Sequence, residues 1–185
     1  MKKFLIILGI VALVLIAALA YVRFFYTKSF SPEGEVAFEN GKLKVGVYYN
    51  RPSKKSRVIF AKDGLVPFGK VWRTGANEAS IFKTNQSLDF GGKTLEAGEY
   101  SLWTIPGEQS WKIIFNKEIP GWGVGFDGQA LRNPEMDALM IEAPSVTQDK
   151  EFEQFTISVE KAGEEMELLF IWDKTLVAAP FSSKN

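Results

Sequence analysis

The sequence predicts an all-β domain, a sandwich or flattened barrel of about nine antiparallel strands, preceded by one N-terminal transmembrane helix. Three observations support this prediction. Apolar residues alternate with polar or small ones along several short segments, as expected for strands with one buried face. Turn sequences that contain glycine separate these segments. A run of 19 residues without a charge occupies positions 4–22.

The uncharged run at residues 4–22 is long enough to cross a bilayer. As an α-helix it would measure about 28 Å, close to the ~30 Å of the hydrocarbon core. Lys2 and Lys3 precede the run, and aromatic residues follow it, as expected at a membrane–water interface. We therefore expect residues 1–26 to be a signal anchor in the lipid bilayer of the cell membrane. The anchor crosses once and leaves the C-terminal domain outside the cytoplasm.

A cleaved secretory signal is the alternative for this segment. Ala18 and Ala20 fit the small-residue pattern of a processing site, and cleavage near Ala20 would give a secreted or periplasmic protein. The apolar run exceeds the usual ~7–15 residues of a signal peptide, which favours the anchor. We expect residues 27–34 to form a stalk and residues 35–185 to form the β domain.

Strand faces and turns can be assigned from the period-two pattern. Residues 43–49, 155–159 and 166–172 carry apolar side chains at every second position, so one face of each strand should be buried. Trp111 and Trp172 fall on such faces and are expected in the core. The hairpin turns are expected at three dipeptides, which are Gly91-Gly92, Pro106-Gly107 and Ala162-Gly163.

Composition excludes several kinds of chemistry. The chain has no His and no Cys, which removes the commonest general base, the commonest transition-metal ligand, thiolate nucleophiles and disulfides. We expect no metal centre and no cofactor. After the three basic residues that flank the leader, 19 basic residues stand against 22 acidic ones. A weakly negative domain without a basic stripe does not suit nucleic acid as a partner.

The densest cluster of polar and aromatic residues lies at positions 69–78. Here an indole could offer a stacking face, and neighbouring polar groups could fix a ligand's orientation. The predicted ligand-binding residues are Trp72, Arg73, Asn77 and Glu78, with Trp103 and Trp122 as further stacking candidates. The structural alternative is a loop in which Arg73 pairs with a carboxylate and Asn77 holds a turn.

Two further motifs partly match known binding or catalytic patterns. The glycine-rich segment at residues 120–128 lacks the Lys and Ser or Thr of a phosphate loop, so phosphate binding is not expected there. A functional alternative, which we do not favour, is a mobile loop that carries Trp122 and Phe126 over a pocket. Ser80 and Lys83 have the spacing of acyl-transfer enzymes, which need it on a helix. In a strand this spacing sends the two side chains to opposite faces, which excludes the mechanism.

Three functions stay open. The leading hypothesis is a module that binds an envelope glycan, a peptide or a protein partner without catalysis. The second is a glycan hydrolase that uses two carboxylates, for which Glu78, Asp127 and Asp137 are the candidates. The third is a purely structural envelope assembly protein, which would expose an apolar patch or a sheet edge.

Several motifs resemble a bacterial family catalogued as domain of unknown function 2911. They are NRP at residues 50–52, GLVPFGKVWRTGANEA at 64–79, AGEYSLWTIPG at 97–107 and WKIIFNK at 111–117. The similarity covers residues 43–181 in order, with Trp103 where the family pattern has Phe and Ser56 where it has Gly. The resemblance implies an exported protein with a signal or an anchor. It implies no activity, so no catalytic residue is carried over.

Overall fold

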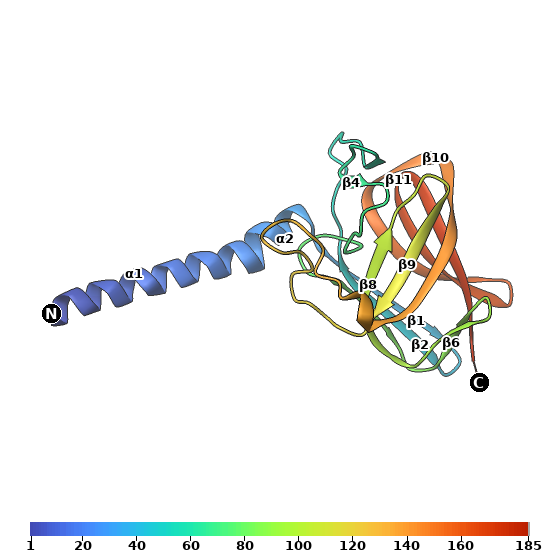
Figure 1. Ribbon diagram of the computed structural model, residues 1–185, viewed down its shortest axis with the longest axis horizontal. Helices are drawn as coiled ribbons and strands as arrows, with labels where there is room; N and C mark the ends of the chain where they lie inside the picture. Colours follow the sequence, from blue (N-terminus) through green and yellow to red (C-terminus); the bar gives the residue numbers. More distant parts are fainter. Residues whose placement is uncertain (185) are drawn as a thin grey trace.

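The N-terminal segment forms one long helix that projects from a β domain in the computed structural model, which describes residues 1–184 (Figure 1). The α-helix α1 spans Lys2–Tyr21, the π-helical turn η1 spans Val22–Tyr26 and α2 spans Thr27–Phe30. No side chain of α1 is buried. The helix is long and apolar enough to cross a membrane, a property that signal sequences share. Its exposed apolar surface suits lipid better than water.

The segment predicted as a stalk, residues 27–34, contains regular structure. The helix continues to Phe30 and β1 begins at Glu33, so only Ser31 and Pro32 lie between them. Ser31 is extended, with φ −142° and ψ 82°, because a residue that precedes proline is disfavoured in the helical conformation. The β domain is therefore joined to the helix by two residues.

Nine strands form one antiparallel sheet in the order β1-β2-β5-β8-β9-β10-β11-β6-β7. Their bounds are β1 Glu33–Asn40, β2 Leu43–Asn50, β5 Ser80–Thr84, β6 Leu88–Phe90, β7 Lys93–Leu95, β8 Gly98–Ile105, β9 Ser110–Asn116, β10 Asp137–Ala162 and β11 Glu165–Ser183. The short strands β3 (Phe60–Ala61) and β4 (Val66–Pro67) pair in parallel, and a 3-10 turn, η2, spans Pro134–Met136. The predicted all-β architecture is confirmed.

The long strand β10 folds the sheet over itself (Figure 1). Residues 137–144 of β10 pair with β9, and residues 145–162 pair with β11. Register shifts between Thr147 and Phe152, and again before Thr156, mark bulges. Bulges bend a strand and increase its twist, so the two parts of the sheet can face each other and enclose one core.

The predicted strand faces and turns are confirmed. In β11 the side chains of Met166, Leu168 and Phe170 are buried, and Trp111 and Trp172 are each 1% exposed. The three predicted dipeptides lie at the β6–β7, β8–β9 and β10–β11 hairpins. Three glycines of these hairpins have positive φ, namely Gly91 at 61°, Gly92 at 88° and Gly163 at 67°. Glycine adopts this conformation without steric cost.

Replacing Phe115 by Ala should lower the free energy of unfolding by about 3–5 kcal/mol. The ring is 0% exposed and packs against Phe82 and Phe90, so its removal leaves a cavity. Phe126→Ala is the matched control, because the Phe126 side chain is fully exposed and should change stability by no more than about 0.5 kcal/mol. Urea titration of the full chain in detergent measures both. Equal losses for the two variants would contradict the assigned core.

Candidate functional site

A cleft of about 880 Å³ opens where the helix meets the β domain. One wall comes from the end of the helix at Phe30 and Ser31, and other walls come from residues 52–57, 65–76 and 124–130. Trp72 and Trp172 also line it. Its volume falls within the ~300–1,000 Å³ that is usual for small-molecule sites.

The charges that line this cleft are all positive. They belong to Lys55, Arg57, Lys70 and Arg73, and no Asp or Glu lines the cleft within residues 1–184. The rest of the β domain carries the excess of acidic residues, so the positive charge is concentrated here. Charges of one sign in a concave surface reinforce one another's potential. The cleft therefore attracts anions.

Arg73 is the least exposed of the four cations. Its Nη1 donates hydrogen bonds to the carbonyl oxygens of Asn77, at 2.8 Å, and Trp122, at 3.0 Å. Burial lowers the pKa of Arg73, and the charge of Glu78 opposes this, yet a guanidinium stays protonated in proteins. In the described part of the chain no carboxylate lies within salt-bridge distance of Arg73. The alternative of an Arg73–carboxylate pair is therefore wrong, and Arg73 lines the cleft without a direct ion pair among residues 1–184.

Trp72 belongs both to the cleft and to an aromatic cluster of the core. Its ring lies 4.8 Å from the Phe155 ring and 5.9 Å from the Trp172 ring, between centroids. The indole Nε1 donates to the carbonyl of Gly75 at 3.0 Å, and the Trp72 backbone forms a bridge with Thr104. These contacts hold the ring in one orientation. Part of the half-buried ring is left for the cleft.

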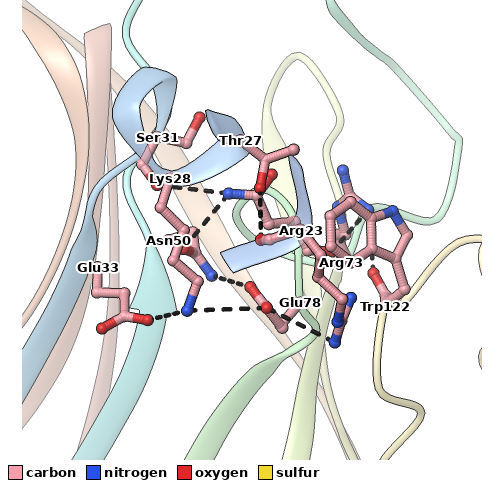
Figure 2. Close-up of polar contacts among 10 residues, drawn as sticks. Arg23, Thr27, Lys28, Ser31, Glu33, Asn50, Arg73, Glu78 and Trp122 are labelled. Carbon is pink, nitrogen blue, oxygen red and sulfur yellow. Dashed lines mark hydrogen bonds and ion pairs between the residues drawn. The ribbon is translucent and has the colours of Figure 1, made fainter. Parts of the chain in front are cut away.

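Neither Asn77 nor Glu78 lines the cleft. Glu78 faces the helix junction (Figure 2). The chain reverses between Arg73 and Glu78, because Thr74 and Asn77 adopt left-handed conformations with φ of 52° and 56°. Asn77 is buried, and its Nδ2 lies 3.5 Å from the carbonyl oxygen of Ser31. Asn77 therefore takes part in the turn through its backbone, while its side chain contacts Ser31 and Asn50 instead of holding the turn as the structural alternative expected.

Glu78 connects the helix to the sheet. Its Oε2 accepts a hydrogen bond from Asn50 Nδ2 at 3.0 Å, and its Oε1 lies 3.7 Å from Arg23 Nη2 and 3.8 Å from Lys28 Nζ. Lys28 also donates to a carboxylate oxygen of Glu33 in β1. Figure 2 shows these groups converging between the helix and the strands. Two cations of the helix thus lie against two acids of the domain at the helix junction.

Trp103 lies outside the cleft. Its side chain points to the face of β8 opposite to Leu102, which belongs to the main core. Trp103 is 0% exposed and packs with Ala79 and Ile114 in a small cluster separate from the main core. Its Nε1 donates to Ser101 Oγ at 2.7 Å. The structure thus places Trp103 in a core and not against a ligand. An alternation pattern shows that a residue lies on one face of a strand but does not show that both faces are covered.

Trp122 lies between two arginines and not over the cleft. Its ring centroid is 4.7 Å from the Arg23 guanidinium carbon and 6.0 Å from that of Arg73. The next residues of the same loop, including Val124 and Ala130, line the cleft. Phe126 does not cover the pocket as in the loop alternative, because its side chain is fully exposed.

Three cations of the cleft are absent from the predicted ligand site. Lys70 lies inside the predicted segment at 69–78, and Lys55 and Arg57 lie in a basic stretch at 54–57. That basic stretch is the only local sequence signal for Lys55 and Arg57 as cleft residues. The pairing of β3 with β4 brings the two segments together, and no spacing in the sequence reveals it.

The three carboxylates considered for catalysis have separate partners. Asp137 pairs with Arg132 and accepts from Asn116 Nδ2 at 2.8 Å. Asp127 accepts from the backbone N–H of Gln129 at 3.0 Å, and Glu78 takes part in the helix junction. None of them lines the cleft. Nothing in this geometry sets two carboxylates across the cleft.

The comparisons with known proteins find one family. Its model, described as Protein of unknown function (DUF2911), matches residues 31–181. The match confirms the resemblance seen in the sequence motifs and extends it to β1. No curated protein and no solved structure matches the chain.

Replacing Glu33 by Gln should make the loss of stability in acid less steep. The hydrogen bond from Lys28, and next the Tyr48 hydroxyl, lower the pKa of Glu33 from its ordinary value of 4.5. A lowered pKa stabilises the fold above pH 4.5, and this stabilisation is lost as pH falls through the folded-state pKa. The change should stay below about 1 kcal/mol, because the pair is exposed.

Urea titrations between about pH 3 and pH 7 measure this effect. Glu35→Gln is the control, since Glu35 is an exposed acid of the same strand and takes part in none of the ion pairs among residues 1–184. If Glu33→Gln leaves the loss of unfolding free energy between pH 7 and pH 3 unchanged, or if both variants change it equally, the assigned junction is contradicted.

Proposed function

The chain belongs to the family described as Protein of unknown function (DUF2911), and we propose that it is a membrane-anchored module that binds an anionic ligand outside the cytoplasm. The family description assigns no activity, so the proposal rests on the chain's own residues. The observation that carries it is the cleft of about 880 Å³, lined by four cations and by no acid within residues 1–184.

The helix supports the anchored part of the proposal. Its uncharged run has the length of a bilayer core, and the domain covers none of it, since no residue of α1 is buried. Leaving so many apolar side chains in water is unfavourable by about 25 cal/mol for each Å². Insertion into lipid removes this cost. Lys2 and Lys3 ahead of the run favour a cytoplasmic N-terminus.

Arg73 supports the anionic part of the proposal. Its Nη1 is used by two carbonyl oxygens, while Nε and Nη2 have no hydrogen-bond partner within residues 1–184. Charge-assisted hydrogen bonds from guanidinium to carboxylate or phosphate are stronger than neutral ones. Partial burial of Arg73 lowers the local dielectric and strengthens its attraction for an anion.

Trp72 supports a ligand that carries a ring or another apolar surface. Its half-buried indole lines the cleft beside Trp172 and Val66, and a sugar ring stacked on it would cover apolar area at little entropic cost. An anionic saccharide of the cell envelope combines both features. A peptide carboxylate shares the charge but makes less use of the indole face.

Binding is better supported than hydrolysis. The cleft offers groups that hold a negative charge, but within the described residues it offers no acid, and the chain contains no His or Cys. A carboxylate pair at about 5–10 Å is what glycoside hydrolysis requires. The candidate carboxylates Glu78 and Asp137 are engaged elsewhere by their own partners.

The proposal predicts that N-acetylglucosamine 1-phosphate binds more tightly than neutral N-acetylglucosamine, and that the difference shrinks as salt rises. Lys70→Gln should weaken binding of the phosphate by about 5- to 10-fold, because one charge contact is removed. Isothermal titration of the full chain in nanodiscs of neutral lipid measures these affinities.

Lys42→Gln is the matched control for this experiment. Lys42 is an exposed lysine beside the β1–β2 turn and does not line the cleft, so its removal should leave the affinity unchanged. Both lysines are exposed, so neither change should disturb the fold. Equal binding of the neutral and phosphorylated sugars would contradict an anion site, and equal losses for the two variants would contradict its location.

A further inference from the structure

The loop between β9 and β10, residues 117–133, lies beside the helix. In Figure 1 this yellow to orange loop is the part of the β domain that reaches furthest along the helix toward the N-terminus. Arg23 stacks on Trp122 of the loop, with 4.7 Å between guanidinium carbon and ring centroid. Helix and loop are therefore in direct contact.

The contact lies at the end of the membrane-spanning run. Arg23 is the first residue after the uncharged residues 4–22. One residue of helix advances about 1.5 Å, so the Trp122 ring stands close to the boundary of the hydrocarbon core when the helix is inserted. Tryptophan is enriched at this depth, where an apolar ring meets polar headgroups.

Phe126, four residues along the loop, makes almost no contact with its own chain. Its side chain is 116% exposed, and Ile119 and Leu131 of the same loop are 40% and 47% exposed. On the helix, Phe25 and Tyr26 are 68% and 53% exposed just beyond the uncharged run. The loop and the end of the helix that it contacts thus both present exposed apolar side chains.

The loop is held in this position by the helix junction. The helix is continuous to Phe30, and the Glu78 carboxylate faces both Arg23 and Lys28. Arg73 also connects the loop to the segment at residues 69–78, because it donates a hydrogen bond to the Trp122 carbonyl. Insertion of the helix therefore carries the loop to the membrane surface without a change in the fold.

We infer that the β9–β10 loop is a second membrane contact, with Phe126 inserted among the lipids of the outer leaflet and Trp122 at the headgroups. This inference rests on the proposed anchor. The occupant is the bilayer and not a protein, because the loop that carries the exposed side chains contacts the helix at Arg23, where the uncharged run ends. Since Val124 and Ala130 of this loop also line the cleft, the cleft is held close above the membrane.

Single cysteines test the inference, because the chain contains none. A small environment-sensitive fluorophore is attached to Phe126→Cys, to Val146→Cys or to Leu13→Cys, each in the full chain reconstituted into phosphatidylcholine vesicles. Val146 is the matched control, an exposed apolar residue of β10 that pairs with Leu176 of β11 and not with the β9–β10 loop. Leu13 lies within the spanning run and reports insertion. Lipid-borne nitroxide and aqueous iodide serve as the two quenchers.

The inference predicts that nitroxide lipids quench the probe at position 126 at least several-fold more than the probe at position 146, and that iodide shows the reverse order. If iodide quenches both of these probes equally while the probe at position 13 is quenched by lipid, the anchor stands and the loop contact is overturned. If the probe at position 13 is not quenched by lipid, the anchored function itself fails, and the loop contact with it.

Discussion

The structure depends on the bend of β10, a strand that belongs to both parts of the sheet. Because β10 pairs first with β9 and then with β11, the two parts face each other and enclose a core that is mostly apolar. The rings of Trp111, Phe155 and Trp172 fill the space near the bend. Trp72 packs on this group from outside the regular strands, so the core itself sets one edge of the cleft.

The segment that follows Trp72 serves two neighbouring regions. Trp72 and Arg73 belong to the cleft, and after the left-handed residues Thr74 and Asn77 the chain presents Glu78 to the helix. One short loop therefore connects the cleft to the helix junction. Arg73 makes the link physical, since it lines the cleft and donates to the Trp122 carbonyl. A substitution at the helix junction should accordingly alter the position of Arg73 in the cleft.

The proposed membrane attachment would give the cleft a particular supply of ligand. A site held a short distance above a bilayer meets molecules confined to that surface at a high effective concentration. Under the proposal its four cations would also stand near the headgroups, where anionic lipids add a negative potential that falls off within a Debye length of about 8–10 Å. An anionic glycan carried at the membrane surface fits both conditions better than a freely diffusing solute.

The apolar helix, the buried strand faces and the hairpin turns all follow from the sequence, because hydropathy and period-two alternation are local properties that any window of the chain displays. Trp72 and Arg73, which the sequence singled out through their shared segment, both line the cleft. The cleft as a whole was not, because β3–β4 pairing brings Lys55 and Arg57 to Lys70 across more than ten residues. Only the tertiary structure could separate Trp103 from the cleft, turn Glu78 toward Arg23 and leave Phe126 exposed. Each of these outcomes depends on a neighbour that is distant along the chain.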